Sequence, residues 1–149
     1  VVDRFGTTFT VRPDSTVELV AEHVDFGGDR KLLVESEGEL LLVDMHESSR
    51  LRIDVFKLCE REKKWMKLKN LARKVLFLGH GCSFSASTLD LCVSKGNCVI
   101  FIDDAFLSVM NLLHGKCVFH LDQGRLSPMS HYPEYFNLFW PPPDWIFKS

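Results

Sequence analysis

Short apolar runs separated by turn residues recur along the whole chain, which is the pattern of an all-β fold. Two pairs of runs flank the turn sequences Pro13-Asp14-Ser15 and Glu37-Gly38, and they predict β-hairpins. The predicted strands lie at 9–11, 17–20, 31–34, 39–43, 51–58, 65–68, 75–78, 98–102, 117–121 and 125–129. Strands never alternate with long helices, so we expect an antiparallel meander and no parallel βαβ sheet.

Two segments also fit a helix. Apolar residues within 65–76 recur at helical spacing, so a helix stays an alternative to strands in this range. Residues 105–113 are also apolar, with Asp103 or Asp104 as a possible N-cap and Gly115 as a possible C-cap. Helix and loop are equally compatible with that second segment.

A weak internal repeat relates the two halves of the chain. The strings at 31–35, 40–44 and 55–58 resemble those at 75–79, 99–103 and 118–121, at offsets of about 44 to 63 residues. This is near the length of a four-stranded propeller blade. We therefore expect a partial β-propeller of two to three four-stranded antiparallel blades. The expected boundaries are 1–28 for the end of one blade, 31–74, 75–130, and 131–149 for a C-terminal tail.

The composition is that of a globular domain with a buried core, because 46% of the 149 residues are hydrophobic. A net charge of −2 supplies no positive field for nucleic acid phosphates, so nucleic-acid binding is not expected. The sequence shows no apolar run long enough to span a bilayer and no secretory leader, so no membrane partner is expected either.

The cysteines are odd in number, scattered, and never spaced as Cys-x-x-Cys. They are Cys59, Cys82, Cys92, Cys98 and Cys117. This pattern is typical of reduced thiols, so we expect a cytoplasmic or nuclear location.

Ordered strings across essentially the whole chain carry a family resemblance. They lie at 2–6, 31–44, 55–58 followed by Trp65, 75–87, 96–104, 119–130 and 137–146. The chain resembles the C-terminal part of plant F-box proteins, the KIB-type β-propeller formerly labelled a domain of unknown function. The match is most specific at Phe139-Trp140-Pro141-Pro142-Pro143-Asp144-Trp145.

The resemblance implies a non-catalytic protein-binding domain in a substrate receptor. In that family an F-box recruits the Skp adaptor of a cullin-type (SCF) ubiquitin ligase, while the propeller holds a protein target. No segment here corresponds to an F-box, and the chain opens at Val1 without Met, so we expect an N-terminal truncation. A free-standing or truncated propeller-derived adaptor that recruits no ligase is the alternative.

The residues shared with the family are expected to have structural roles. They are Gly38, Trp65, Gly79, Cys82, Ser83, Phe84, Ser85, Gly96, Asn97, Cys98, Phe139, Trp140, Pro141, Pro142, Pro143 and Trp145. Similar family members carry a more polar, acidic or aromatic loop where this chain has 105–116. The resemblance identifies neither a target protein nor a binding residue.

Candidate catalytic and metal-binding patterns are incomplete. Gly81 to Ser85 nearly forms a Gly-x-Ser-x-Gly nucleophile elbow, but Ser85 replaces the final glycine, so a hydrolase using Cys82 or Ser83 ranks third. His80 and Cys82 share one strand face, and with Cys92 and Cys98 they lack the paired spacing of a zinc site. We predict no catalytic residue, no metal and no cofactor.

Charged and proline-rich segments have structural explanations. The basic run 61–74 fits a membrane-binding or calmodulin-binding helix, but it fits a solvated outer strand better. The carboxylates Glu35, Glu37 and Glu39 alternate as on a solvent-facing strand, and Asp103-Asp104 calls for no chemistry either. The segment 139–145 is more compatible with a packed structural strap than with a polyproline ligand.

Overall fold

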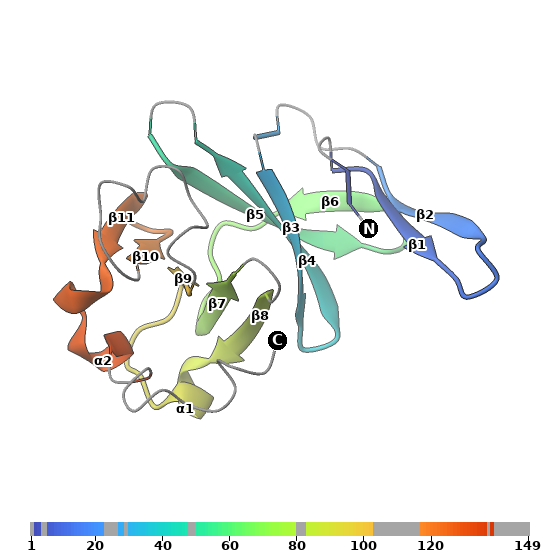
Figure 1. Ribbon diagram of the computed structural model, residues 1–149. Helices are drawn as coiled ribbons and strands as arrows, with labels where there is room; N and C mark the ends of the chain where they lie inside the picture. Colours follow the sequence, from blue (N-terminus) through green and yellow to red (C-terminus); the bar gives the residue numbers. More distant parts are fainter. Residues whose placement is uncertain are drawn as a thin grey trace. The chain divides into compact units, whose positions relative to one another are not determined.

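The computed structural model describes residues 2–3, 6–22, 27–28, 30–47, 50–79, 83–102, 117–136 and 138. The chain divides into two compact units, Val1–Lys69 and Asn70–Ser149. Most described residues of both units lie in strands or their turns, as the sequence predicts (Figure 1).

The first unit begins with a β-hairpin of β1 (Thr8–Val11) and β2 (Val17–Ala21). The carboxylate of Asp14 closes the turn, because it accepts hydrogen bonds from the Thr16 amide at 3.0 Å and the Thr16 hydroxyl at 2.6 Å. The hairpin predicted around Pro13-Asp14-Ser15 is therefore confirmed.

The rest of the first unit is a four-stranded antiparallel sheet. Its strands, adjacent in chain order, are β3 (Arg30–Ser36), β4 (Glu39–His46), β5 (Arg52–Cys59) and β6 (Lys64–Lys67). Glu37 and Gly38 join β3 to β4 with φ angles of 52° and 80°. Two consecutive positive φ angles define the turn type that best matches strand twist in a two-residue hairpin. Residues 41–45 of the central strand β4 are all buried.

The structure decides between helix and strand for 65–76. This range contains β6, a turn, and the start of β7 (Lys74–Leu78). Ala72 has a left-handed φ of 54°, and the Lys74 amide donates to the Leu71 carbonyl at 3.1 Å. The helical alternative is therefore wrong. The helix-like spacing of apolar residues includes Leu71, which is buried in the connection between two strands.

The second unit holds a five-stranded sheet in the order β11-β10-β9-β7-β8 (Figure 1). Besides β7, its strands are β8 (Ser83–Ser87), β9 (Cys98–Phe101), β10 (Cys117–His120) and β11 (Arg125–Pro128). Three of the four neighbouring strand pairs keep the expected antiparallel pairing, but β7 and β9 are parallel. This pair departs from the uniformly antiparallel meander that the strand pattern predicts.

A short helix produces the parallel pair. After β8 the chain enters α1 (Thr88–Leu91), where the Ser87 hydroxyl caps the Asp90 amide at 3.1 Å. Residues 93–97 then return the chain to the other side of β7, where the side chain of Asn97 accepts from the Leu71 amide at 2.8 Å. Parallel neighbours require such a crossover. A four-residue helix is too short to give a detectable period in the sequence.

The core of the second unit lies between its sheet and two short C-terminal elements. These elements are η2 (Met129–His131) and α2 (Pro133–Phe136). The buried residues of this core cluster are Val75, Phe77, Val93, Cys98, Ile100, Val118, Met129 and Tyr135. Phe84 stacks on Phe77 with ring centroids 4.8 Å apart. Burial of each large apolar side chain here contributes about 1.5–3 kcal/mol.

Two predictions concern residues outside the described ones: the helix or loop at 105–113 and the strap at 139–145. The blade boundaries at 1–28, 31–74, 75–130 and 131–149 also stay predictions. None of the helices in the described residues is long and apolar enough to cross a membrane.

Candidate functional site

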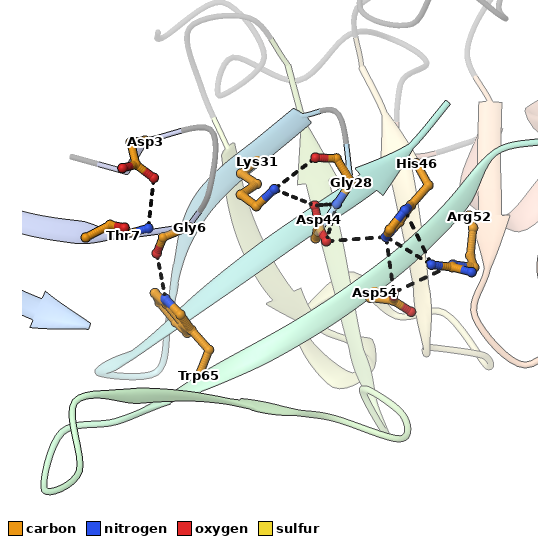
Figure 2. Close-up of polar contacts among 10 residues, drawn as sticks. All are labelled: Asp3, Gly6, Thr7, Gly28, Lys31, Asp44, His46, Arg52, Asp54 and Trp65. Atoms are coloured by element: carbon orange, nitrogen blue, oxygen red, sulfur yellow. Dashed lines mark hydrogen bonds and ion pairs between the residues drawn. The ribbon is translucent and has the colours of Figure 1, made fainter. Parts of the chain in front are cut away.

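A row of charged side chains crosses one face of the four-stranded sheet (Figure 2). Lys31 on β3 lies opposite Asp44 on β4, and Asp44 lies opposite Asp54 on β5. On the edge strand β6, the Lys67 ammonium lies 3.2 Å from the Asp54 carboxylate. All four strands therefore contribute one charged residue to the row.

The centre of the row is a buried ion pair. Lys31 Nζ lies 3.2 Å from Asp44 Oδ1, and each side chain is only 1% exposed. The Gly28 amide donates to both Asp44 oxygens at 2.9 and 2.8 Å, and Lys31 donates to the Gly28 carbonyl at 2.9 Å. Because buried charges are costly unless paired and hydrogen-bonded, this closed set of contacts is what makes the pair tolerable.

Gly28 is part of this arrangement because no side chain fits at its position. A Cβ atom there would lie 2.4 Å from the Met45 carbonyl oxygen and 2.9 Å from the His46 ring. The backbone therefore passes directly over β4 and brings its amide to Asp44. Glycine supplies the close approach that the ion pair needs.

His46 links the two aspartates. Its Nε2 lies 3.3 Å from Asp44 and 3.4 Å from Asp54, as Figure 2 shows. The Arg52 guanidinium lies within 3.3 Å of the same ring and 3.7 Å from Asp54. The ring thus lies among two acidic groups and one basic group.

Asp44, His46 and Asp54 also form a possible cation site, because their ligand atoms lie within 4.8 Å of one another. Three positive side chains already contact the two carboxylates: Lys31, Arg52 and Lys67. Both oxygens of Asp44 also accept amide hydrogen bonds. A divalent cation would have to displace these donors, so the geometry favours an internal ion-pair network over a metal centre.

A second buried polar group lies in the core of the other unit. Cys98 on β9 and His120 on β10 are direct cross-strand neighbours, and both are 0% exposed. The Cys98 thiol lies 3.7 Å from the Tyr135 hydroxyl, which donates to the Lys95 carbonyl at 2.6 Å. The His120 ring packs against Tyr132 with centroids 4.7 Å apart. Neither ring nitrogen has a hydrogen-bond partner within the described residues.

The protonation states of this group oppose nucleophilic chemistry. Burial raises the pKa of Cys98 to about 11, and burial lowers the pKa of His120. Burial also raises the pKa of Tyr135. A catalytic Cys/His pair needs an easily formed thiolate beside a proton acceptor, whereas here a neutral thiol faces a neutral ring.

Comparison with known proteins identifies the family. The family model described as KIB1-4 beta-propeller matches residues 2–122. The chain belongs to the KIB1-4 β-propeller family. The resemblance drawn from the sequence strings is confirmed, and the separate, mostly antiparallel sheets fit a partial propeller.

Similar proteins of Arabidopsis thaliana are F-box proteins. The chain is 34% identical to F-box protein At2g17036 over 99% of its own length and 35% identical to F-box protein SKIP23 over 97%. A putative F-box/kelch-repeat protein, At5g24040, is 26% identical. The chain spans 42% of the length of the first two relatives. No solved structure matches it.

Some residues shared with the KIB1-4 family have clear local roles. Gly38 has a φ of +80° and open space around it, so the turn conformation explains this glycine. Trp65 on β6 donates its indole N–H to the Gly6 carbonyl at 3.1 Å, which ties the N-terminal segment to the sheet. Gly79 is buried directly after β7.

The near-elbow segment is strand rather than a strand-to-helix turn. Ser83, Phe84 and Ser85 all lie in β8, paired antiparallel with β7. A nucleophile elbow places its serine at a sharp turn between a strand and a helix, and Ser83 and Ser85 do not have that setting. Cys82 and its neighbour His80 lie outside the described residues.

The segment 96–98 anchors the crossover in the second unit. A Cβ atom at Gly96 would lie 2.9 Å from the Ala72 carbonyl oxygen, so this residue packs directly on the 72–73 turn. Asn97 holds the turn through its side chain and has a left-handed φ of 56°. Cys98 begins β9 in the core. The remaining shared residues, at 139–143 and 145, lie outside the described residues.

The other proposed ligands are dispersed. Cys92 is exposed at the end of α1, whereas Cys98 is buried against Tyr135, and neither belongs to a three-ligand group among the described residues. Glu35 and Glu37 are exposed, and Glu39 pairs with Lys57 at 2.8 Å. Asp103 and Asp104 lie outside the described residues.

The basic run forms a solvated strand and its flanking turns, as the favoured interpretation predicts. Its exposed basic residues are Arg61, Lys63, Lys64, Lys67, Lys69 and Arg73. Sequence reasoning missed the charged row that crosses β3, β4, β5 and β6. The available signal was a single acid, Asp44, inside the otherwise apolar 40–45 segment.

Proposed function

We propose that this chain is the target-binding part of an F-box subunit of a cullin-type ubiquitin ligase. The observation that carries the proposal is the near-complete match of the chain to part of two Arabidopsis F-box proteins. In this arrangement an F-box elsewhere in the complete gene product recruits the Skp adaptor. The propeller holds the protein to be ubiquitinated.

Binding without catalysis is the second element of the proposal. Its support is that Lys31 pairs with Asp44, that Lys67 pairs with Asp54, and that Cys98 and His120 are neutral core groups. Neither cluster offers an activated nucleophile or an open metal position. A cytoplasmic or nuclear location, expected from the unpaired cysteines, belongs to the same proposal.

Affinity purification of the complete gene product tests the proposal. The tagged protein is purified from plant cells with the proteasome inhibited, beside a form that lacks residues 1–149. We expect both forms to carry the Skp adaptor, and only the complete form to carry ubiquitinated target proteins. The truncated form is the matched control, since it separates ligase recruitment from target binding.

Two outcomes would contradict the ligase proposal. Absence of the Skp adaptor from the purified complete protein favours the alternative of a propeller-derived adaptor without ligase recruitment. Equal recovery of ubiquitinated proteins with both forms shows that residues 1–149 do not select targets.

A further inference from the structure

The strand β6 lies at the edge of the four-stranded sheet. Among the described strands, β6 pairs with β5 alone. The Leu68 amide donates to the Val55 carbonyl at 2.8 Å, so residues 64, 66 and 68 direct their main-chain groups toward β5. By the alternation of an antiparallel ladder, residues 63, 65 and 67 direct theirs away from the sheet.

One of these outward carbonyl groups already accepts a hydrogen bond from another segment of the chain. The Glu22 amide, directly after β2, donates to the Lys63 carbonyl at 2.9 Å. The main-chain groups of Trp65 and Lys67 follow along the same edge and face no other strand of the described part of the chain. Within the described residues, no strand pairs with this edge beyond the position that Glu22 occupies.

The side chains along this edge are strongly basic. Residues 63–69 contain four lysines and no acid. Lys67 is held by Asp54, whereas Lys63, Lys64 and Lys69 are exposed and have no acidic partner within the described residues. Met66 lies between them with 58% of its surface exposed. The edge thus combines unpaired positive charge with one exposed apolar contact.

We propose that the β6 edge, residues 63–69, is a docking site for an acidic, extended segment of a partner protein. The segment adds as a fifth strand, with main-chain hydrogen bonds to Trp65 and Lys67, acidic side chains beside the lysines and an apolar side chain on Met66. The inference rests on the proposed protein-binding function and assigns a surface to it.

Charge decides which strand can occupy the edge. Lysines on an edge strand repel a second copy of the same edge, which is how many proteins prevent sheet-to-sheet association. The same lysines lower the free energy of binding for an acidic strand, so one feature excludes self-pairing and selects the partner.

A synthetic acidic peptide is the direct probe. The complete gene product is titrated with a blocked peptide of about eight residues that alternates Glu and Val. The comparison peptide has the same sequence with N-methyl groups on its central residues, which keeps the charge and removes the main-chain donors. We expect binding of the first peptide only, and weaker binding as salt rises from about 50 to about 300 mM.

Matched protein variants locate the site. Lys64→Glu with Lys69→Glu should weaken peptide binding at least about tenfold, because both charges change from attractive to repulsive. Arg73→Glu with Arg125→Glu makes the same charge change at two exposed residues outside β6 and should leave binding unchanged.

Three results would overturn the docking site: equal binding of the N-methylated peptide, unchanged binding by the Lys64 and Lys69 variant, or equally tight binding of anionic phospholipid vesicles through the same lysines. The variant is also purified for its Skp adaptor and ubiquitinated proteins. If the variant no longer binds the peptide but still carries the Skp adaptor and the ubiquitinated proteins, the β6 edge does not hold the targets, and the ligase function stands. If the adaptor is absent from the unmodified protein, the ligase function fails independently of the peptide result.

Discussion

Lys31 and Asp44 form an ion pair between neighbouring strands in which each side chain keeps only 1% of its exposure. The pair is held by hydrogen bonds to both main-chain groups of Gly28. A buried charge is tolerated only while its partner is present. The pair therefore holds Gly28 and the start of β3 against β4.

Removal of one member should therefore be far more damaging than loss of a surface pair. Lys31→Met leaves the Asp44 carboxylate buried without its counter-charge and should cost about 3–5 kcal/mol of unfolding free energy. Arg12→Ala removes a pair with Glu18 that is more than half exposed and should cost less than about 1 kcal/mol. Urea unfolding followed by tryptophan fluorescence measures both.

A double substitution separates charge from packing. Lys31→Met with Asp44→Leu removes both charges, and it should be less destabilising than Lys31→Met alone. If the double variant is the less stable of the two, the damage comes from altered packing, and the account of the buried charge is wrong.

The two glycines around this sheet should respond differently to substitution. At Gly28 an added Cβ meets the Met45 carbonyl oxygen, so Gly28→Ala and Gly28→Asn should each cost about 1–3 kcal/mol through overpacking. At Gly38 the space is open and only the φ of +80° matters. Gly38→Ala should cost about 1 kcal/mol, and Gly38→Asn less, since Asn tolerates left-handed backbone. Thermal unfolding of the four variants checks this, and tolerance of Gly28→Asn would contradict the steric argument.

Local pattern was sufficient to predict the hairpins of the first unit. In β3 and β4, register follows from a two-residue turn, and Lys31 and Asp44 lie at equal distances from Glu37-Gly38. Their pairing was therefore accessible from the sequence, although it was not predicted. The contact with Asp54 depends on how the longer connection after β4 sets the register of β5, which no short-range signal gives.

The second unit was harder to predict because its decisive contacts are remote in the sequence. The parallel pairing of β7 and β9 depends on α1 and on the amide of Leu71 reaching the Asn97 side chain. The burial of His120 depends on Tyr132 and Tyr135 from the C-terminal elements. Apolar periodicity marks such strands but carries no information on which of them become neighbours.

His120 should make the second unit sensitive to acid. Burial lowers its pKa below the ordinary value of 6.5, so the folded protein binds a proton less readily than the unfolded chain. Stability is then complete above pH 6.5 and falls as the pH drops from 6.5 toward the lowered folded value. His120→Phe keeps an aromatic ring and removes the titration, so its unfolding free energy should depend less on pH in this interval. If the unfolding free energies of the two proteins change equally with pH, His120 is not the responsible group.

The hairpin of β1 and β2 should cause self-association when the 149-residue chain is expressed alone. Val11 and Val17 are direct cross-strand neighbours, and they are 56% and 61% exposed. This exposed apolar pair lies on a two-stranded sheet, neither edge of which pairs with a further full strand of the described residues, and such a surface favours association with other copies. Sedimentation velocity should show larger species as the protein concentration rises.

Val11→Thr with Val17→Thr keeps the strand preference and should shift the distribution toward monomer. Leu89→Gln, at a 74% exposed residue of α1, is the control and should have a smaller effect. A compact monomer at every concentration would show that the hairpin is not an association surface.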